Sequence, residues 1–290
     1  MAFRPVLMTK LMLRSHRAPL TRTPAAADLA YEDVAFPAAD GVGLKGWFVP
    51  ADPGAPAIVF VHGWMWNRLG NVAGQTPVPD RDVDFLPAVR ALHEAGYHVL
   101  LFDVRRHGES DAGKGPLTYG PIEARDFVGA VRHLRSRAEV DGERIGAIGT
   151  SAGGNIVLYG VPAAQPIRAV LAIQPTRLDD FNANFARTEL GRFGPALLKP
   201  IDLLYALLRA PRPSEHDPAI PARALDGTVV RYVQGTGDQW GSATVVEEIA
   251  AATPHTDGPV VRFPSTERYS GYRYISERVD EVVAFFKQYL

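Results

Sequence analysis

From about residue 29 onward, short apolar runs alternate with longer segments in which apolar and polar positions are mixed. Eight of these runs are continuously or alternately apolar and are separated by turns containing Gly, Pro or Asp, which is typical of strands. They cover residues 29–36, 42–49, 57–61, 97–102, 145–148, 169–173, 229–233 and 260–263. The Ala-Asp-Gly turn at residues 39–41 predicts that the first two pair antiparallel. The apolar runs in the middle of the chain favour a sheet that is buried on both faces.

The segments between these runs carry apolar residues at helical spacing. Such stripes lie at residues 83–95, at 122–135, from 155 onward, at 243–251 and from 279 to the end of the chain. Strands that alternate with helices are the signature of a mainly parallel sheet with helices packed on both of its faces. The pattern therefore predicts an α/β fold with eight strands.

Two segments fall outside this alternation. Residues 177–213 are rich in leucine and carry no strand pattern, so we expect a helical insert that covers the site as a lid. Residues 1–28 mix Leu and Met with basic residues and hold no uncharged run near the roughly 18 residues that a spanning helix needs. We expect an N-terminal helical extension packed on a domain at 29–290, with docking to a membrane surface as the alternative.

Composition narrows the function classes. Hydrophobic residues make up 46% of the chain and charged residues 22%, which predicts a stable core rather than disorder. The 31 basic residues are balanced by 32 acidic ones, so no nucleic-acid partner is expected and the predicted partner is a small-molecule substrate. The absence of cysteine excludes disulfides, thiolate catalysis and cysteine-ligated metals, and it suits a cytoplasmic location. We predict no cofactor and no metal, and the oligomeric state is left open.

The strongest chemical signal is the stretch Gly149-Thr150-Ser151-Ala152-Gly153, a G-x-S-x-G pattern between a predicted strand and a predicted helix. A sharp strand-to-helix turn forces the serine into strained backbone, and small flanking residues let the neighbouring backbones pass closely. The serine oxygen then stands at the carboxyl edge of the sheet. Ser151 is therefore the candidate nucleophile.

With this context the chain resembles the α/β-hydrolase superfamily from about residue 29 to the C-terminus. The resemblance implies the α/β-hydrolase fold, an eight-stranded, mostly parallel sheet with helices on both faces and a helical lid. His62-Gly63-Trp64 resembles the oxyanion segment of that family, which implies that the backbone N–H groups of Trp64 and Ala152 bind the developing negative oxygen. Gly235-Thr236-Gly237-Asp238 is similar to the loop that presents the acid, which implies Asp238 as the triad carboxylate.

The histidines of the chain do not fall where this resemblance needs one. His62 and His107 lie in segments that shape loops in the family, so a structural role is expected for both. Trp64 and Trp66 are expected to wall a pocket. His255 precedes the last strand and should lie at the amino edge of the sheet, far from Ser151.

The order Ser, Asp, His predicts the base in the loop after residues 260–263, and residues 264–273 contain no histidine. Three explanations are open. The histidine is replaced at Tyr269 or Ser270; the fold serves a non-hydrolytic or binding task; or another base, with Glu267 as the first candidate, reaches Ser151 from a loop. A phenol with a pKa near 10 is roughly 0.1% ionised at neutral pH, so Tyr269 would need a strongly perturbed environment.

The sequence thus favours a serine hydrolase of carboxylic ester or related acyl bonds. Its expected site is Ser151 as nucleophile, Trp64 and Ala152 as oxyanion donors, and Asp238 with Tyr269 as the remaining catalytic positions. A protein inactivated by the loss of the histidine is included in this hypothesis. The alternative is a non-hydrolytic or ligand-binding protein on the same scaffold, and an interaction protein that keeps only the scaffold is a third possibility.

Overall fold

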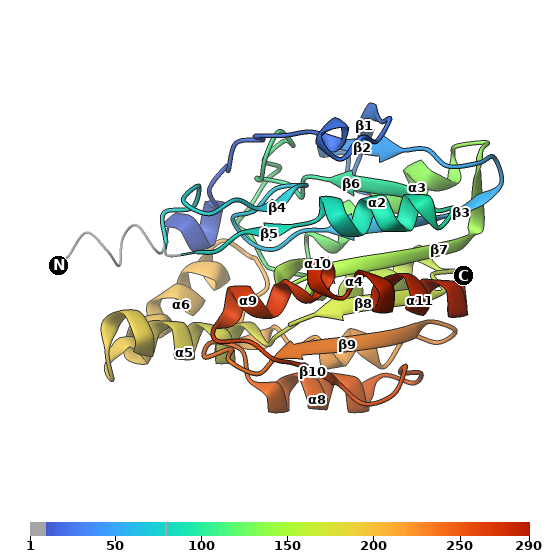
Figure 1. Ribbon diagram of the computed structural model, residues 1–290. Helices are drawn as coiled ribbons and strands as arrows, with labels where there is room; N and C mark the ends of the chain where they lie inside the picture. Colours follow the sequence, from blue (N-terminus) through green and yellow to red (C-terminus); the bar gives the residue numbers. More distant parts are fainter. Residues whose placement is uncertain (1–9, 79) are drawn as a thin grey trace.

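An eight-stranded sheet runs through the centre of the molecule (Figure 1). The computed structural model of the chain describes residues 10–78 and 80–290. The strands lie in the order β1-β2-β6-β3-β7-β8-β9-β10, and β2 runs antiparallel to β1 and β6 while the other pairs are parallel. Their bounds are β1 Glu32–Pro37, β2 Gly43–Val49, β3 Ala55–Val61, β6 His98–Phe102, β7 Val140–Thr150, β8 Ala169–Ile173, β9 Val229–Gly235 and β10 Val261–Phe263.

All eight predicted strands and the antiparallel opening pair are present, so the predicted fold class is confirmed. The main difference in bounds is β7, which begins five residues before the predicted start at 145. Residues 141–144 are polar because they extend past the core, and a shift of register between β3 and β7 falls in this region. A polar strand end gives no hydrophobic pattern from which it could be predicted.

The segment predicted as a helix over residues 83–95 divides into two elements. Val83–Asp84 is strand β5, which pairs with β4 (Gly70–Asn71) in a separate two-stranded ribbon, and helix α2 begins only at Leu86. The Asp84 carboxylate accepts a hydrogen bond of 3.0 Å from the Leu86 N–H. This side-chain contact satisfies an orphan donor at the start of α2, so Asp84 ends the strand and begins the helix.

Helices cover both faces of the sheet, as the buried strands require (Figure 1). Alternate residues along β6 belong to opposite core clusters: Leu100 and Phe102 pack on one side, Val99 and Leu101 on the other. The first cluster includes side chains of α3 (Ala124–Arg135), α4 (Ala152–Ala164) and α8 (Ala243–Ala252). The second includes side chains of α2 (Leu86–Glu94) and α11 (Val279–Tyr289).

The predicted insert at 177–213 is helical. It contains α5 (Leu178–Leu190), the 3₁₀ turn η2 (Gly194–Leu198), α6 (Lys199–Leu207) and the start of η3 (Pro213–Glu215), and α7 (Ala219–Ala222) follows. Figure 1 shows α5 and α6 beyond the carboxyl ends of the parallel strands. His216 fastens this insert to the body, because its Nδ1 accepts from the Leu178 N–H at 3.3 Å and its Nε2 donates to the Tyr119 carbonyl at 3.1 Å. A role of the insert as a moving lid stays a prediction.

The predicted helical extension at residues 1–28 is described only from residue 10, so its part at residues 1–9 lies outside the described residues. Residues 10–14 are helical, and η1 (Pro24–Ala27) follows. Leu11 and Met12 are buried, which agrees with an extension packed on the body. In the described ranges no helix combines the length and hydrophobicity that crossing a membrane requires.

The segment expected as the loop after the last strand folds into α9 (Arg268–Tyr272) and α10 (Tyr274–Glu277). Glu267 caps α9: its carboxylate accepts hydrogen bonds of 2.8 Å from the N–H groups of both Tyr269 and Ser270. The Ser270 hydroxyl in turn accepts from the Glu267 N–H at 3.2 Å. This reciprocal pair satisfies orphan donors at the helix start and makes Arg268 the first helical residue.

Candidate active site

The turn at Ser151 has the strained geometry that its small neighbours predict. Ser151 lies between β7 and α4 with φ +53° and ψ −122°, a positive φ that non-glycine residues rarely adopt. A Cβ at Gly153 would stand 2.0 Å from the Val61 carbonyl oxygen, and one at Gly149 would stand 2.5 Å from the Gly153 carbonyl oxygen. Backbone this close admits only glycine at both positions, so the turn that exposes Ser151 depends on them.

The two backbone groups expected to bind an oxyanion are the N–H groups of Trp64 and Ala152, two residues that line the same cavity as Ser151. The Ser151 N–H itself donates to the Ile173 carbonyl at 2.9 Å. The N–H groups of Trp64 and Ala152 donate no hydrogen bond to any of the residues that the structure describes. Ala152 opens α4, so the helix dipole adds positive potential at its N–H. Two unpaired donors beside a serine hydroxyl suit a carbonyl or carboxylate oxygen.

Asp238 follows β9, as its position in the Gly235–Asp238 loop predicts, and its carboxylate is fully buried. It accepts hydrogen bonds from the Gln234 Nε2 at 3.2 Å, the Trp240 N–H at 3.0 Å and the Gly241 N–H at 2.9 Å. It also forms an ion pair with Arg268. Four side-chain and backbone donors thus surround this one carboxylate.

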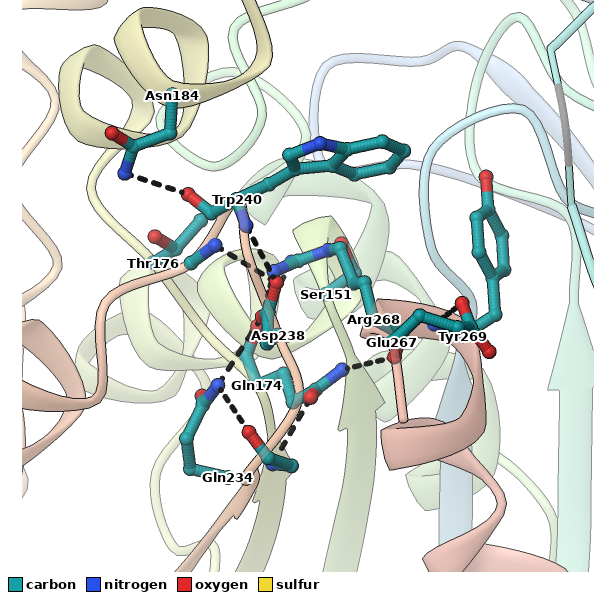
Figure 2. A network of polar contacts seen from close by, with 12 residues as sticks. Ser151, Gln174, Thr176, Asn184, Gln234, Asp238, Trp240, Glu267, Arg268 and Tyr269 are labelled. Carbon is teal, nitrogen blue, oxygen red and sulfur yellow. Dashed lines mark hydrogen bonds and ion pairs between the residues drawn. The ribbon is translucent and has the colours of Figure 1, made fainter. Parts of the chain in front are cut away.

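Arg268 occupies the place between the acid and the serine (Figure 2). Its Nη1 pairs with Asp238 Oδ2, and its Nη2 donates to Ser151 Oγ at 3.2 Å and to the Gln174 carbonyl at 3.4 Å. Burial works against the charge, but the Asp238 carboxylate, with smaller contributions from Tyr272 and Tyr269, outweighs it, and the pKa of Arg268 is raised above its ordinary value. Arg268 is therefore a permanent cation at the position where a triad would hold its base.

Tyr269, the expected substitute for the histidine, does not occupy that position. Figure 2 shows its phenol directed away from Asp238 and Ser151. Its ring packs 6.3 Å from Trp66 and 6.3 Å from Trp240, centroid to centroid. Burial, with a smaller contribution from nearby Tyr272, raises the pKa of Tyr269. The prediction that Tyr269 takes the place of the base is therefore wrong. Because α9 begins at Arg268, the residue before Tyr269 is the one that faces the serine.

The other candidate bases are engaged elsewhere. Glu267 and Ser270 form the cap of α9 described above. The His62 Nδ1 donates to the Gly63 carbonyl at 2.8 Å while its Nε2 accepts from the Val104 N–H at 3.0 Å, so His62 fastens two loops. His107 bonds the Arg105 carbonyl and the Ser15 hydroxyl. His255 lies beside the start of β9, at the amino edge of the sheet, as predicted.

Two further residues hold this arrangement and were not singled out from the sequence. Gln174, buried after β8 with φ +52°, donates from Nε2 to the Arg268 carbonyl at 2.9 Å and accepts at Oε1 from the Gly235 N–H at 3.0 Å. Tyr272 places its ring 5.3 Å from the Arg268 guanidinium. The Tyr272 hydroxyl lies beside Ser151 and Gln174 but makes no hydrogen bond of normal geometry, and burial raises its pKa to about 12. No motif marks either residue.

Two adjoining cavities, which cover about 440 and 370 Å³ when the space open to solvent is included, meet at Ser151 and share Trp64, Phe181 and Phe185. The expected role of Trp64 and Trp66 as pocket walls agrees with their place in these linings. The larger cavity is also lined by Met12, whose carbonyl accepts from the Tyr119 hydroxyl at 2.8 Å. The smaller one is lined by Arg268 and by aromatic residues of the α9 region. The cavities offer apolar walls with a few polar groups gathered at the serine.

The sequence pattern of the alpha/beta hydrolase family matches residues 58–284, most of the chain. The chain belongs to the alpha/beta hydrolase family. The esterase Pf2001 of Pyrococcus furiosus superposes with a TM-score of 0.73 at 22% identity, over 96% of this chain and 98% of that one. The alpha/beta hydrolase GrgF of a Penicillium species superposes with a TM-score of 0.66 at 18% identity, over 90% and 99%. At these identities the likeness concerns the fold.

Sequence relatives match over shorter stretches. The protein YfhR of Salmonella typhimurium is 35% identical over 144 residues, which are 48% of this chain and 42% of YfhR. The thiohydrolase aneE of Aspergillus aculeatus is 27% identical over 145 residues, 50% of this chain and 42% of aneE. The chain thus spans less than half the length of these curated relatives. Among the residues the structure describes there is no cluster of side chains suited to hold a metal ion.

Proposed function

We propose that the chain binds acyl compounds at Ser151 and that Arg268 keeps it from hydrolysing esters at ordinary rates. The observation that carries this proposal is the Arg268 bridge between Ser151 Oγ and Asp238. Hydrolase and esterase relatives support a site for carboxylic esters, thioesters or their acids. The finer assignment, Ser151 as nucleophile with Trp64 and Ala152 as oxyanion donors, is part of this proposal.

Proton transfer is the step that Arg268 impedes. A serine alcohol attacks a carbonyl only when a neighbour takes its proton, and general-base help contributes roughly 10² to 10⁴ in rate. A guanidinium has five donors and no acceptor, so it can hold the serine oxygen but cannot receive its proton. Asp238 supports Arg268 by pairing with it, where in a triad it would orient an imidazole.

Binding of an acyl group is supported by features that Arg268 leaves intact. The strained φ of Ser151 persists although backbone strain of this kind costs about 1–3 kcal/mol, which argues that the exposed hydroxyl has a use. The N–H groups of Trp64 and Ala152 donate to no described residue, and both residues line the pocket at Ser151. Together they suit one oxygen of an acyl group.

The test restores the missing acceptor. We expect Arg268→His to raise turnover of p-nitrophenyl butyrate by at least about 10², the low end of general-base catalysis. Because imidazole is shorter than the arginine side chain, Arg268→Ala with added imidazole is the second arm, and it should gain activity in proportion to the imidazole concentration. Tyr269→His is the matched control: its side chain faces the aromatic cluster, and it should gain nothing.

Ser151→Ala in the Arg268→His background should abolish the gain, since nucleophile and base act as a unit. Ser151-dependent hydrolysis at ordinary rates by the unchanged protein would refute suppression by Arg268. Failure of both rescue arms, together with resistance of Ser151 to a fluorophosphonate probe, would refute Ser151 as a nucleophile.

The second candidate is a binding protein that forms no acyl-enzyme. The same observation favours it, because the group that meets the Ser151 hydroxyl at the bridge is a guanidinium, which has donors and no acceptor. It differs from the first candidate in one result: the aromatic cavities would still bind an acyl compound while Ser151 stayed inert in every variant.

A further inference from the structure

Three arginines are buried in the described part of the chain, and two of them each meet two carboxylates. Arg68 pairs with Asp103 and Glu109. Arg105 pairs with Asp40 at 2.8 Å and with Asp126 at 2.7 Å. A guanidinium presents donors along more than one edge, so a second carboxylate can bind without displacing the first.

Arg268 is the third, and within residues 10–78 and 80–290 it meets one carboxylate, that of Asp238. Its Nη2 donates to Ser151 Oγ at 3.2 Å and to the Gln174 carbonyl at 3.4 Å, which are long contacts to neutral oxygens. Its side chain is 5% exposed, and it lines the 370 Å³ cavity together with Ser151. A carboxylate arriving at Ser151 would meet a desolvated cation there.

The lining of the two cavities carries a positive charge, as a carboxylate ligand requires. Among the described residues that line them, Arg268 is the only charged one, and no acidic side chain is present. Phe181 stacks its ring 4.9 Å from the guanidinium. The remaining walls are mostly aromatic or aliphatic: Met12, Trp64, Met65, Trp66, Tyr119, Leu178, Phe185, Trp240, Tyr269 and Tyr272.

We propose that this site binds a carboxylic acid with an apolar body, held by its carboxylate between Arg268 and Ser151. One carboxylate oxygen accepts from the Ser151 hydroxyl and the Arg268 Nη2. The other accepts from the N–H groups of Trp64 and Ala152, so the inference rests on the proposed function for that half of the site. The apolar body lies in the cavities on either side of Ser151.

This ligand class differs from the ester that an active triad would cleave. A neutral ester offers acceptors but no charge, whereas a carboxylate forms charge-assisted hydrogen bonds, which are roughly twice as strong as neutral ones. A triad imidazole is neutral at pH 7 when it acts as base, while Arg268 is charged at every pH of interest. The replacement therefore shifts the preference of the site from the ester to the acid.

The experiment compares 4-phenylbutyrate with 4-phenylbutyramide, a neutral probe of nearly the same shape, on the full chain at pH 7. Calorimetry gives both dissociation constants, and quenching of the cavity tryptophans provides a second signal. We expect the acid to bind at least about tenfold tighter than the amide, and its affinity to fall as salt is added.

Variants separate charge from shape. Arg268→Lys keeps the charge and should keep a preference for the acid. Arg268→Gln with Asp238→Asn removes both charges, so no buried charge is left unpaired, and it should bind acid and amide equally. Circular dichroism checks that the double variant folds; the comparison of the two probes on the unchanged protein decides the inference without it.

The outcomes distinguish this inference from the proposed function. Equal binding of acid and amide by the unchanged protein overturns the carboxylate preference and leaves acyl binding at Ser151 standing. If neither probe binds, and neither the Arg268→His nor the imidazole-rescued variant gains esterase activity, both proposals fail.

Discussion

Arg105 and Arg268 are both buried beside aspartates, but they belong to differently built regions. Arg105 is enclosed by Asp40 at 2.8 Å and Asp126 at 2.7 Å. Arg268 is held on one side by Asp238 and faces a cavity on the other. The first region joins loops and a helix around a fully paired charge. The second leaves a charge half paired at the carboxyl edge of the sheet, where ligands of α/β folds bind.

A buried charge therefore does not by itself indicate a ligand-binding site. The two arginines differ in how many hydrogen-bond donors their partner aspartates have besides the arginine itself. Asp126 receives all its hydrogen bonds from Arg105, from the side chain and from the backbone N–H. Asp238 has three donors that do not belong to Arg268.

The largest effect is expected from Arg105→Met. It leaves Asp126 buried with a single backbone donor, and loss of one partner of a buried pair typically costs about 3–5 kcal/mol. Urea unfolding followed by circular dichroism measures the loss. Arg125→Met is the matched control: Arg125 also bonds Asp40, but it is exposed, so its removal should cost at most about 1 kcal/mol.

A smaller loss, about 1–3 kcal/mol, is expected from Arg268→Met, because Asp238 keeps three donors. Adding Asp238→Asn should recover part of that loss, since the unpaired charge is removed. The same urea titration compares both variants with Arg105→Met. A loss at Arg268 equal to that at Arg105 would contradict the distinction drawn between the two regions.

The smallest expected effect is a pH dependence of the free energy of unfolding, which we assign to the Arg105 region and not to Arg268. Burial lowers the pKa of His62 to about 4, and burial together with its neighbour His62 lowers that of His107 to about 3. Both imidazoles are neutral in the folded chain, so their contribution is complete above the unfolded pKa near 6.5 and is lost as pH falls toward 4 and 3. Between pH 7 and pH 6 these two imidazoles should together lower the free energy of unfolding by about 1.4 kcal/mol. His216, whose pKa burial also lowers to about 4, acts in the same direction, whereas Asp126, whose pKa burial raises to about 7, acts in the opposite direction.

The His107 ring bonds the Arg105 carbonyl, so this acid sensitivity belongs to the Arg105 region. His107→Asn keeps a donor toward that carbonyl and removes the titrating ring, and it should make the loss between pH 7 and pH 6 smaller by about 0.7 kcal/mol, the share of one imidazole. An unchanged pH dependence in this variant would assign the sensitivity to other groups. Arg268→Met should leave the pH dependence in this range as it is.

The hydrophobic pattern was enough to predict the sheet, because strands buried on both faces must be apolar and helices must alternate with them. Local composition was also enough for the serine turn: Gly149 and Gly153 are required wherever a strand passes into a helix this closely. The position of Asp238 after a late strand was implied by the resemblance of residues 235–238 to the acid-presenting loop of the family. These features depend on residues that are neighbours along the chain.

The occupant of the base position depends on contacts between distant segments, and only the tertiary structure decided it. Arg268, Tyr269 and Ser270 are adjacent in the sequence, and nothing in their order says which of them faces Ser151. The cap at Glu267 sets where α9 begins, and Gln174, nearly a hundred residues earlier, holds the Arg268 carbonyl. A rotation of one residue on a helix turns a side chain by about 100°, so this register selects a cation instead of a phenol.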